Sequence, residues 1–253
     1  ILREDMVDGL EHALGSLDEA VNVAMRTVPR HEFVAQGAYD NRPTEHEGTR
    51  VLAPSTVARM LSALEPAEEE TVLIVGAGVG YTAAVLAEIV GPRNVHAIDI
   101  ARQVVYDARA NLSEAGYDAV LVDCRNGDDG LPEYAPYDRV LLEAAAVEPP
   151  RALLEQLDPD GRLVMPLGGN DQTLAAIEHA DDDVPDDADR VADDAAVVER
   201  FGPVALGPML VDGEQAGVPH RNRTEREDRE FARQGYFARS GWEYDWVDWE
   251  DHL

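Results

Sequence analysis

The chain has 253 residues with 45% hydrophobic content, which is enough for one α/β domain with a core and excludes a second full domain. Its 51 acidic residues against 21 basic ones give a formal net charge of -30, which disfavours nucleic-acid binding and predicts a surface that needs counterions. All basic residues are arginine, and acidity runs along the whole chain, which we interpret as cytoplasmic halophilic adaptation.

Two helices are expected before residue 65. Apolar residues recur every three to four positions from Met6 to Arg26, which predicts one amphipathic helix that ends at Val28-Pro29-Arg30. A polar stretch that contains proline follows. A second helix is expected over 57–64, with Ser55 or Thr56 as its capping residue.

From Glu70 onward the pattern predicts strands and helices in alternation, which favours a mostly parallel sheet flanked by helices. Expected strands occupy 71–75, 95–98, 119–122, 137–142 and 161–166, the last after a turn at 158–161. Expected helices occupy 81–90, 102–115 and 150–157. The fold class is therefore α/β and Rossmann-like.

The last third of the chain is less regular. Late strands are expected over 173–178 and 197–201, on either side of the acidic run Asp181 to Asp194, which we interpret as a solvated loop. The end is charged and then aromatic, with Trp242, Trp246 and Trp249 spaced for one helix face. These tryptophans are expected to dock onto the body of the protein or onto another subunit, which suggests a homo-oligomer.

The segment 71–84 runs from an apolar strand through a glycine loop, Gly76-Ala77-Gly78-Val79-Gly80, into a helix. Glycines let the backbone turn sharply and let a ligand approach closely. The N–H groups at the start of the helix suit a carboxylate or a phosphate. An anionic or polar ligand is therefore expected at this loop.

Asp99 ends the next apolar strand, where a carboxylate can accept both hydroxyls of a ribose. The dinucleotide fingerprint is GxGxxG, whereas this loop reads GxGxG with Tyr81 at the fingerprint position. The spacing therefore favours S-adenosyl-L-methionine over NAD. At the following strand end, Asn126 could bond an exocyclic amine of adenine, although a plain polar turn explains the same residues.

Other classes of site find little support. The single cysteine, Cys124, excludes an internal disulfide, and the cysteine and histidines lack metal-ligand spacing, so no metal is expected. A signal peptide and an apolar run of membrane-spanning length are not seen, so a cytoplasmic protein without membrane contacts is expected.

Several ordered motifs together resemble the protein-L-isoaspartate O-methyltransferase family over roughly residues 1–210. The similar segments are Val28-Pro29-Arg30 with Phe33, Tyr39-Asp40-Asn41-Arg42-Pro43, Gly80 to Ala87, Ala135 to Val140, Ala144-Ala145-Ala146, Leu154 to Leu157, and Gly161 to Val164. The resemblance implies methyl transfer from S-adenosyl-L-methionine to isoaspartyl carboxylates of damaged proteins or peptides, a repair reaction in which positioning and desolvation matter most.

The resemblance also implies an organisation and a site. Residues 1–210 would form the methyltransferase-like domain, with N-terminal helices in 1–65 and the cofactor-binding core in 66–210, and residues 211–253 a C-terminal extension. The acceptor side is assigned to Thr49, Ser55 and Thr56. Cofactor binding is assigned to Gly76, Ala77, Gly78, Gly80, Asp99, Ile100, Asn126, Gly127 and Glu143.

The chain departs from the family pattern at four places. Leu52 stands where the family has a serine, Ile74 where it has an acidic residue, 125–127 where it has Gly-Asp-Gly, and Glu143 where it has threonine. Glu143 would repel an incoming carboxylate unless it is paired, and Arg50 or Arg125 could be its partner.

These departures leave three hypotheses: a divergent isoaspartyl methyltransferase, a methyltransferase on the same scaffold with another acceptor, and a non-catalytic protein that binds the cofactor or a partner.

Overall fold

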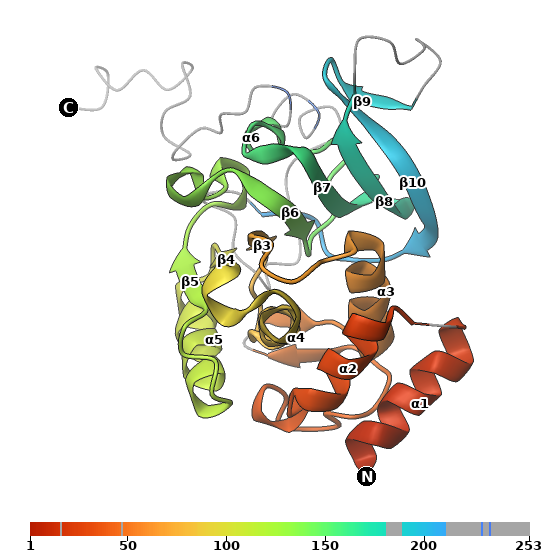
Figure 1. Cartoon of the computed structure of the whole chain (residues 1–253), viewed down its shortest axis with the longest axis vertical. Helices are drawn as coiled ribbons and strands as arrows, with labels where there is room; N and C mark the ends of the chain where they lie inside the picture. Colours follow the sequence, from red (N-terminus) through yellow and green to blue (C-terminus); the bar gives the residue numbers. More distant parts are fainter. Residues whose placement is uncertain (16, 47, 181–188, 211–228, 230–232, 234–253) are drawn as a thin grey trace, which may run out of the picture.

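The computed structural model describes residues 1–15, 17–46, 48–180, 189–210, 229 and 233, and shows a central sheet between helices (Figure 1). Its helices are α1 (Leu2–Leu14), α2 (Glu19–Thr27), η1 (Arg30–Glu32), α3 (Pro54–Leu64), α4 (Tyr81–Val90), η2 (Pro92–Asn94), α5 (Arg102–Glu114), η3 (Gly127–Asp129), η4 (Pro132–Tyr134) and α6 (Arg151–Glu155). Its strands are β1 (Thr44–His46), β2 (Thr49–Val51), β3 (Val72–Val75), β4 (Val95–Asp99), β5 (Leu121–Cys124), β6 (Tyr137–Leu142), β7 (Leu157–Leu167), β8 (Gln172–His179), β9 (Arg190–Ala192) and β10 (Ala195–Val204).

The main sheet has the strand order β5-β4-β3-β6-β7-β8-β10-β9. The first five strands of that order pair in parallel, and β8, β10 and β9 continue the sheet as antiparallel strands. The alternation of strands and helices thus predicted the parallel half correctly, because successive parallel strands need a crossover between them. The predicted Rossmann-like α/β fold class is confirmed.

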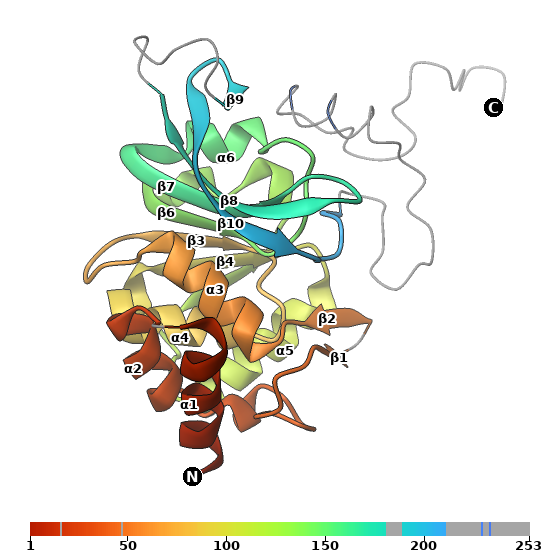
Figure 2. The ribbon, with the colours of Figure 1, turned by 90° about the vertical axis from the view of Figure 1, so that its right-hand side faces the viewer.

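Helices cover both faces of the sheet, with α1 to α5 on one side and α6 on the other (Figure 2). Strand β3 is buried at all four positions, with Val72 and Ile74 in the core under α1 to α5 and Leu73 and Val75 in the core under α6. A strand in the middle of a doubly covered sheet has no solvated face, which explains its continuous apolar run.

The single N-terminal helix expected over 6–26 is wrong, because two helices, α1 and α2, occupy that segment. Gly15 follows α1 with φ 85°, a conformation that ends a helix. Asp18 then starts α2 by accepting hydrogen bonds from the backbone N–H groups of Ala20 and Val21. The apolar period was right, but a local capping residue divides the segment.

Three further local expectations are corrected. Helix α3 begins at Pro54 with Ala53 as its N-cap and no side-chain cap, so neither Ser55 nor Thr56 caps it. The turn expected at 158–161 lies inside β7. The acidic loop is shorter than expected, because β9 occupies 190–192 and pairs with β10.

One feature of the fold was not expected from the sequence. Strands β1 and β2 form a separate two-stranded sheet within the stretch that the sequence marked only as polar. Trp242, Trp246 and Trp249 lie outside the described residues, so their docking stays a prediction.

In the part of the chain that the structure describes, no helix combines the length and the apolar character needed to cross a membrane.

Candidate functional site

The candidate site lies where four parallel strands end along one edge of the sheet. Val75 of β3 is in register with Ile98 of β4 on one side and with Leu142 of β6 on the other. Strand β5 pairs with the far side of β4. The segments that follow these four ends therefore lie along the same edge, which is where open α/β sheets bind ligands.

The glycine loop is folded back onto the end of β4. The backbone N–H groups of Gly76 and Ala77 donate to the carbonyl oxygen of Ile98 at 2.8 and 2.9 Å. A Cβ on Gly80 would lie 3.1 Å from Leu112, whereas a Cβ on Gly78 would meet nothing within 4 Å. Gly80 therefore allows close packing of α4 on α5, and Gly78 leaves an open backbone surface.

Asp99 ties this loop to the end of β4. Its carboxylate accepts hydrogen bonds from the N–H of Gly78 at 3.1 Å and from the N–H of Ala101 at 3.0 Å. Burial raises the pKa of the Asp99 carboxyl, and the backbone donors partly offset this by lowering it. Ile100 follows directly and its carbonyl lies 3.7 Å from the Cys124 sulfur. The structure thus brings the predicted loop and the predicted carboxylate together.

The predicted adenine segment lies beside the same loop. Asn126 is buried, and its Oδ1 has no hydrogen-bond partner within the described residues. A Cβ on Gly127 would lie 2.6 Å from Val75 at the end of β3, so only glycine fits there. A buried amide oxygen without a partner is costly, which makes it a candidate ligand-binding atom.

Glu143 follows β6 and stands next to the glycine loop. Its N–H donates to the carbonyl oxygen of Val75 at 2.8 Å, and a Cβ on Gly76 would lie 3.4 Å from the Glu143 Cβ. Burial raises the pKa of the Glu143 carboxyl to about 7, with Asp99 adding to the rise and Thr82 and Arg30 opposing it. The Oε1 atom is buried without a hydrogen-bond partner in the described part of the chain.

The partners that the sequence suggested for Glu143 are wrong. Arg125 forms ion pairs with Asp123 and Glu133. Arg50 donates a hydrogen bond to the carbonyl oxygen of Ala205 at 3.2 Å. Both arginines are therefore engaged elsewhere, and the positive charge that acts on Glu143 comes from Arg30, which the sequence did not suggest.

The residues predicted to line the acceptor lie on other elements than the residues predicted to bind the cofactor. Thr49 is in β2, opposite His46 in the two-stranded sheet, and Ser55 and Thr56 are in the first turn of α3. The N–H of Ser55 donates to Oδ1 of Asn41 at 3.0 Å. His46 Nε2 contacts Asp107 of α5 at 2.8 Å, which ties the small sheet to the helix that follows Asp99.

Arg30 is a buried residue that the sequence marked only as part of a motif. Its Nε donates to the carbonyl oxygen of Ala38 at 2.7 Å and its Nη2 to that of Leu52 at 2.8 Å. The guanidinium lies 4.4 Å from the centre of the Tyr81 ring. Burial lowers the pKa of Arg30. One side chain therefore joins segment 49–56, which holds the residues predicted to line the acceptor, to the start of α4, and nothing in the spacing of Arg30 signals this.

A second feature missed from the sequence is the segment after β10. The N–H of Ala145 donates to the carbonyl oxygen of Gly207 at 2.8 Å, and the N–H of Met209 donates to that of Ala145 at 2.9 Å. Met209 also approaches Gly127. This segment, 205–209, therefore lies beside the predicted adenine segment.

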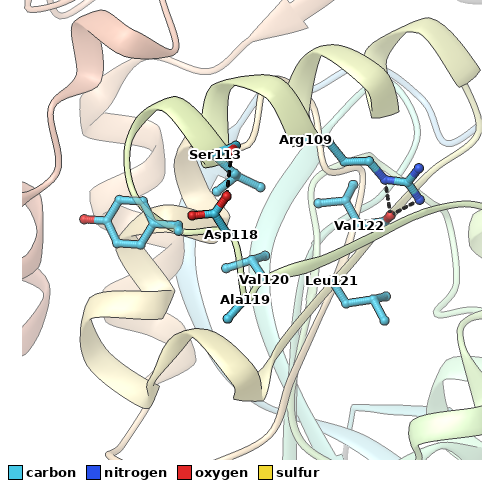
Figure 3. A pocket seen from close by; sticks show the side chains of 9 residues that line it. Arg109, Ser113, Asp118, Ala119, Val120, Leu121 and Val122 are labelled. Atoms are coloured by element: carbon cyan, nitrogen blue, oxygen red, sulfur yellow. Dashed lines mark hydrogen bonds between the residues drawn. The ribbon is translucent and has the colours of Figure 1, made fainter.

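The pocket in Figure 3 is a different place, at the far end of α5. It has a volume of about 460 Å³ and is lined by the last turns of α5, the loop 117–120 and the start of β5. Ser113 donates to Asp118 at 2.6 Å, and Arg109 donates to the carbonyl oxygen of Val122 at 2.8 Å. These side chains are therefore already held by hydrogen bonds within the protein.

Comparison with known proteins gives one consistent result. The family model for protein-L-isoaspartate(D-aspartate) O-methyltransferase matches residues 2–192. The protein-L-isoaspartate O-methyltransferase of Methanosarcina mazei is 43% identical over 183 residues, which are 70% of this chain and 74% of that protein. That of Aeropyrum pernix is 43% identical over 185 residues, 70% of this chain and 71% of that protein.

Solved structures agree in fold. A Plasmodium falciparum protein described as a protein-L-isoaspartate O-methyltransferase, in complex with S-adenosyl-L-homocysteine, superposes with a TM-score of 0.68 at 18% identity, covering 82% of this chain and 98% of that one. Another protein-L-isoaspartate O-methyltransferase gives 0.65 at 20% identity, covering 81% and 65%. At these identities the likeness concerns the fold.

Proposed function

The chain belongs to the protein-L-isoaspartate O-methyltransferase family, and on that premise we propose that it transfers a methyl group from S-adenosylmethionine to isoaspartyl carboxylates of damaged proteins. The proposal is supported chiefly by the range of residues that the family model matches. It runs over residues 2–192 and so includes the acceptor segment as well as the glycine loop. A likeness confined to the cofactor loop would not distinguish acceptors.

The residues at the edge of the sheet fit the nucleoside part of this cofactor. The Gly78 backbone is open, the Asp99 carboxylate is held in place by two N–H groups, and the Asn126 amide oxygen is buried without a partner in the described residues. We propose that the Asp99 carboxylate accepts hydrogen bonds from the ribose hydroxyls and that the Asn126 side chain contacts the edge of the adenine. The surrounding backbone would come from Gly76, Ala77, Gly78, Gly80, Ile100 and Gly127.

The chemistry asks little acid–base work of the chain. When bound, S-adenosylmethionine supplies a methyl group on a sulfonium, and an isoaspartyl carboxylate is already ionised at neutral pH. The residues therefore have to position the acceptor and keep water away. We propose that Thr49, Ser55 and Thr56 line the acceptor, and that Arg30 holds their segment in place through the Leu52 carbonyl.

Methyl transfer to an isoaspartyl peptide at high KCl tests the function, and Leu52→Ser tests the departure in the acceptor segment. We expect transfer by the native protein. Leu52 is buried in the apolar core, so serine there is expected to cost about 2 kcal/mol of stability without raising transfer. Calorimetry of both proteins and radiometric transfer assays provide the measurements.

Cofactor binding by the native protein without transfer would contradict this function and favour another acceptor. Turnover with cell extract but not with the isoaspartyl peptide would identify that case. A rise in transfer in Leu52→Ser would show that leucine limits the acceptor step.

We further propose that the protein works in a salt-rich cytoplasm. The support is the net charge of -30 and the complete absence of lysine. Raising KCl from about 0.1 M to about 1 M shortens the screening length from about 10 to about 3 Å, so repulsion between carboxylates should weaken. We expect the melting temperature to rise by about 5 to 10 °C, measured by circular dichroism.

A sucrose series of equal osmolality is the control, because sucrose stabilises folded proteins by exclusion without screening charge. A melting temperature that is independent of KCl, or that rises equally with sucrose, would contradict the proposal.

The organisation of the chain is also a proposal. We assign residues 1–210 to the methyltransferase unit, supported by a family model that ends at residue 192. Residues 211–253 would be an extension that mediates homo-oligomer formation through its three tryptophans. Light scattering of the full chain at high KCl checks this assignment, and a monomer would overturn it.

A further inference from the structure

Glu143 carries a buried carboxyl group directly after β6. Its Oε1 is buried without a hydrogen-bond partner in the described part of the chain. The charged groups that act on it are Asp99 from the end of β4 and Arg30 from η1. Arg30 donates its own hydrogen bonds to the carbonyl oxygens of Ala38 and Leu52. A buried carboxyl group in this state is costly unless a cation reaches it.

The order of strands indicates which part of the cofactor reaches Glu143. Along the edge, β5 leads to Asn126, β4 to Asp99, β3 to the glycine loop and β6 to Glu143. If adenine lies at Asn126 and ribose at Asp99, the rest of an extended ligand continues over the glycine loop. Its far end then arrives at the end of β6.

The start of α4 supplies the complementary group. Its N-cap, Gly80, carries no side chain that could cap the helix, so the first N–H groups are available to an anion. Thr82, in the first turn, acts on the Glu143 carboxyl through a hydrogen bond. An amino acid carries its carboxylate and its ammonium on one carbon. A carboxylate at this helix start therefore places the ammonium beside Glu143.

Strand β3 has no acidic side chain that could bind the ammonium group of the ligand. It reads Val72-Leu73-Ile74-Val75, and all four side chains are buried in the two cores. The neighbouring strand β6 reaches the same point, because the N–H of Glu143 bonds the carbonyl of Val75. An acidic group next to the glycine loop can thus come from β6.

We propose that Glu143 binds the α-ammonium group of the amino-acid part of S-adenosylmethionine. This inference rests on the proposed function, because it takes the cofactor as given and assigns one of its groups to one residue. It also gives Glu143 a cationic partner, so that the carboxylate would not face the acceptor carboxylate unpaired.

Binding and protonation of Glu143 are then linked. Because the pKa of its carboxyl is raised to about 7, the group is largely protonated below that pH in the free protein. An ammonium favours the ionised form, so binding should release a proton and weaken as the pH falls from about 8 to about 6. The other charged groups that act on the Glu143 carboxyl are Asp99, which raises its pKa, and Arg30, which lowers it.

Isothermal titration calorimetry of the native protein and Glu143→Gln at high KCl tests the inference. The ligands are S-adenosylhomocysteine and 5′-methylthioadenosine, which keeps the nucleoside and lacks the amino-acid group. We expect Glu143→Gln to weaken S-adenosylhomocysteine by about 10- to 100-fold, the effect of one charge-assisted hydrogen bond, and to leave methylthioadenosine unchanged.

Glu148→Gln is the matched control, since Glu148 lies five residues farther along the same segment and pairs with Arg233 at 3.0 Å. It should bind both ligands as the native protein does. Thermal unfolding at about pH 8 confirms the fold of Glu143→Gln, which should be at least as stable as the native protein because a buried charge is removed.

The outcomes separate the inference from the function on which it rests. If the native protein binds neither ligand, the cofactor assignment itself fails. If the native protein binds both and Glu143→Gln binds S-adenosylhomocysteine equally well, or loses both ligands alike, the inference alone is overturned. In the native protein, affinity that does not change with pH would be a further contradiction.

Discussion

Asp99→Ala is expected to weaken S-adenosylhomocysteine binding by about 100- to 1000-fold. The carboxylate accepts hydrogen bonds from Gly78 and Ala101, which leaves lone pairs on both oxygens for a ribose. Two lost hydrogen bonds to a charged group correspond to about 3 to 4 kcal/mol. The change also releases the N–H of Gly78, so the glycine loop loses its anchor.

Isothermal titration calorimetry at high KCl measures this loss. The matched control is Asp118→Ala, which removes a carboxylate at the other end of α5, where Asp118 accepts from Ser113 (Figure 3). That variant should bind as the native protein does. A loss below about threefold in Asp99→Ala would mean that the ribose is held elsewhere, because less than 1 kcal/mol would then depend on this carboxylate.

Arg30→Met is expected to lower the free energy of unfolding by about 3 kcal/mol. Methionine fills most of the space but donates no hydrogen bonds to the carbonyl oxygens of Ala38 and Leu52. The contact with the Tyr81 ring is lost as well. Replacing a buried charged side chain can cost little stability when its partners are replaced as well. In Arg30→Met, however, the carbonyl oxygens of Ala38 and Leu52 lose their donor, and the bond to Leu52 is buried.

Urea unfolding at high KCl gives this value, with Arg26→Met as the control. Arg26 pairs with Glu4, Asp8 and Glu11 near the surface, so its removal should cost about 1 kcal/mol or less. If Arg30→Met is no more destabilising than Arg26→Met, the carbonyl contacts do not hold the acceptor segment.

Local signals predicted that the glycine loop, Asp99 and Asn126 lie at the same end of the parallel strands. The glycine loop, Asp99 and Asn126 each follow a strand end, and parallel strands with single crossovers place their ends along one edge. The roles of these residues stay predictions, but their proximity did not need the structure to be foreseen.

The acceptor side was not predictable in the same way. Its contacts join residues that are far apart in the chain, such as Arg50 and Ala205. They involve Arg30, the small sheet of β1 and β2, and the segment 205–209. Side-chain to backbone hydrogen bonds of this kind leave no periodic trace. The suggested pairing of Glu143 with Arg50 or Arg125 failed for the same reason, since spacing says nothing about which distant charges meet.

The sequence by itself determined the α/β class, the order of elements from β3 to β7 and the position of the glycine loop, because hydrophobic period and glycine spacing are local properties of the chain. Only the tertiary structure decided which arginine is buried and what surrounds Glu143. Burial and hydrogen-bond satisfaction depend on all neighbours at once, and these are set by packing across the sheet. The state of the Glu143 carboxyl belongs to this second group, because desolvation by distant segments raises its pKa.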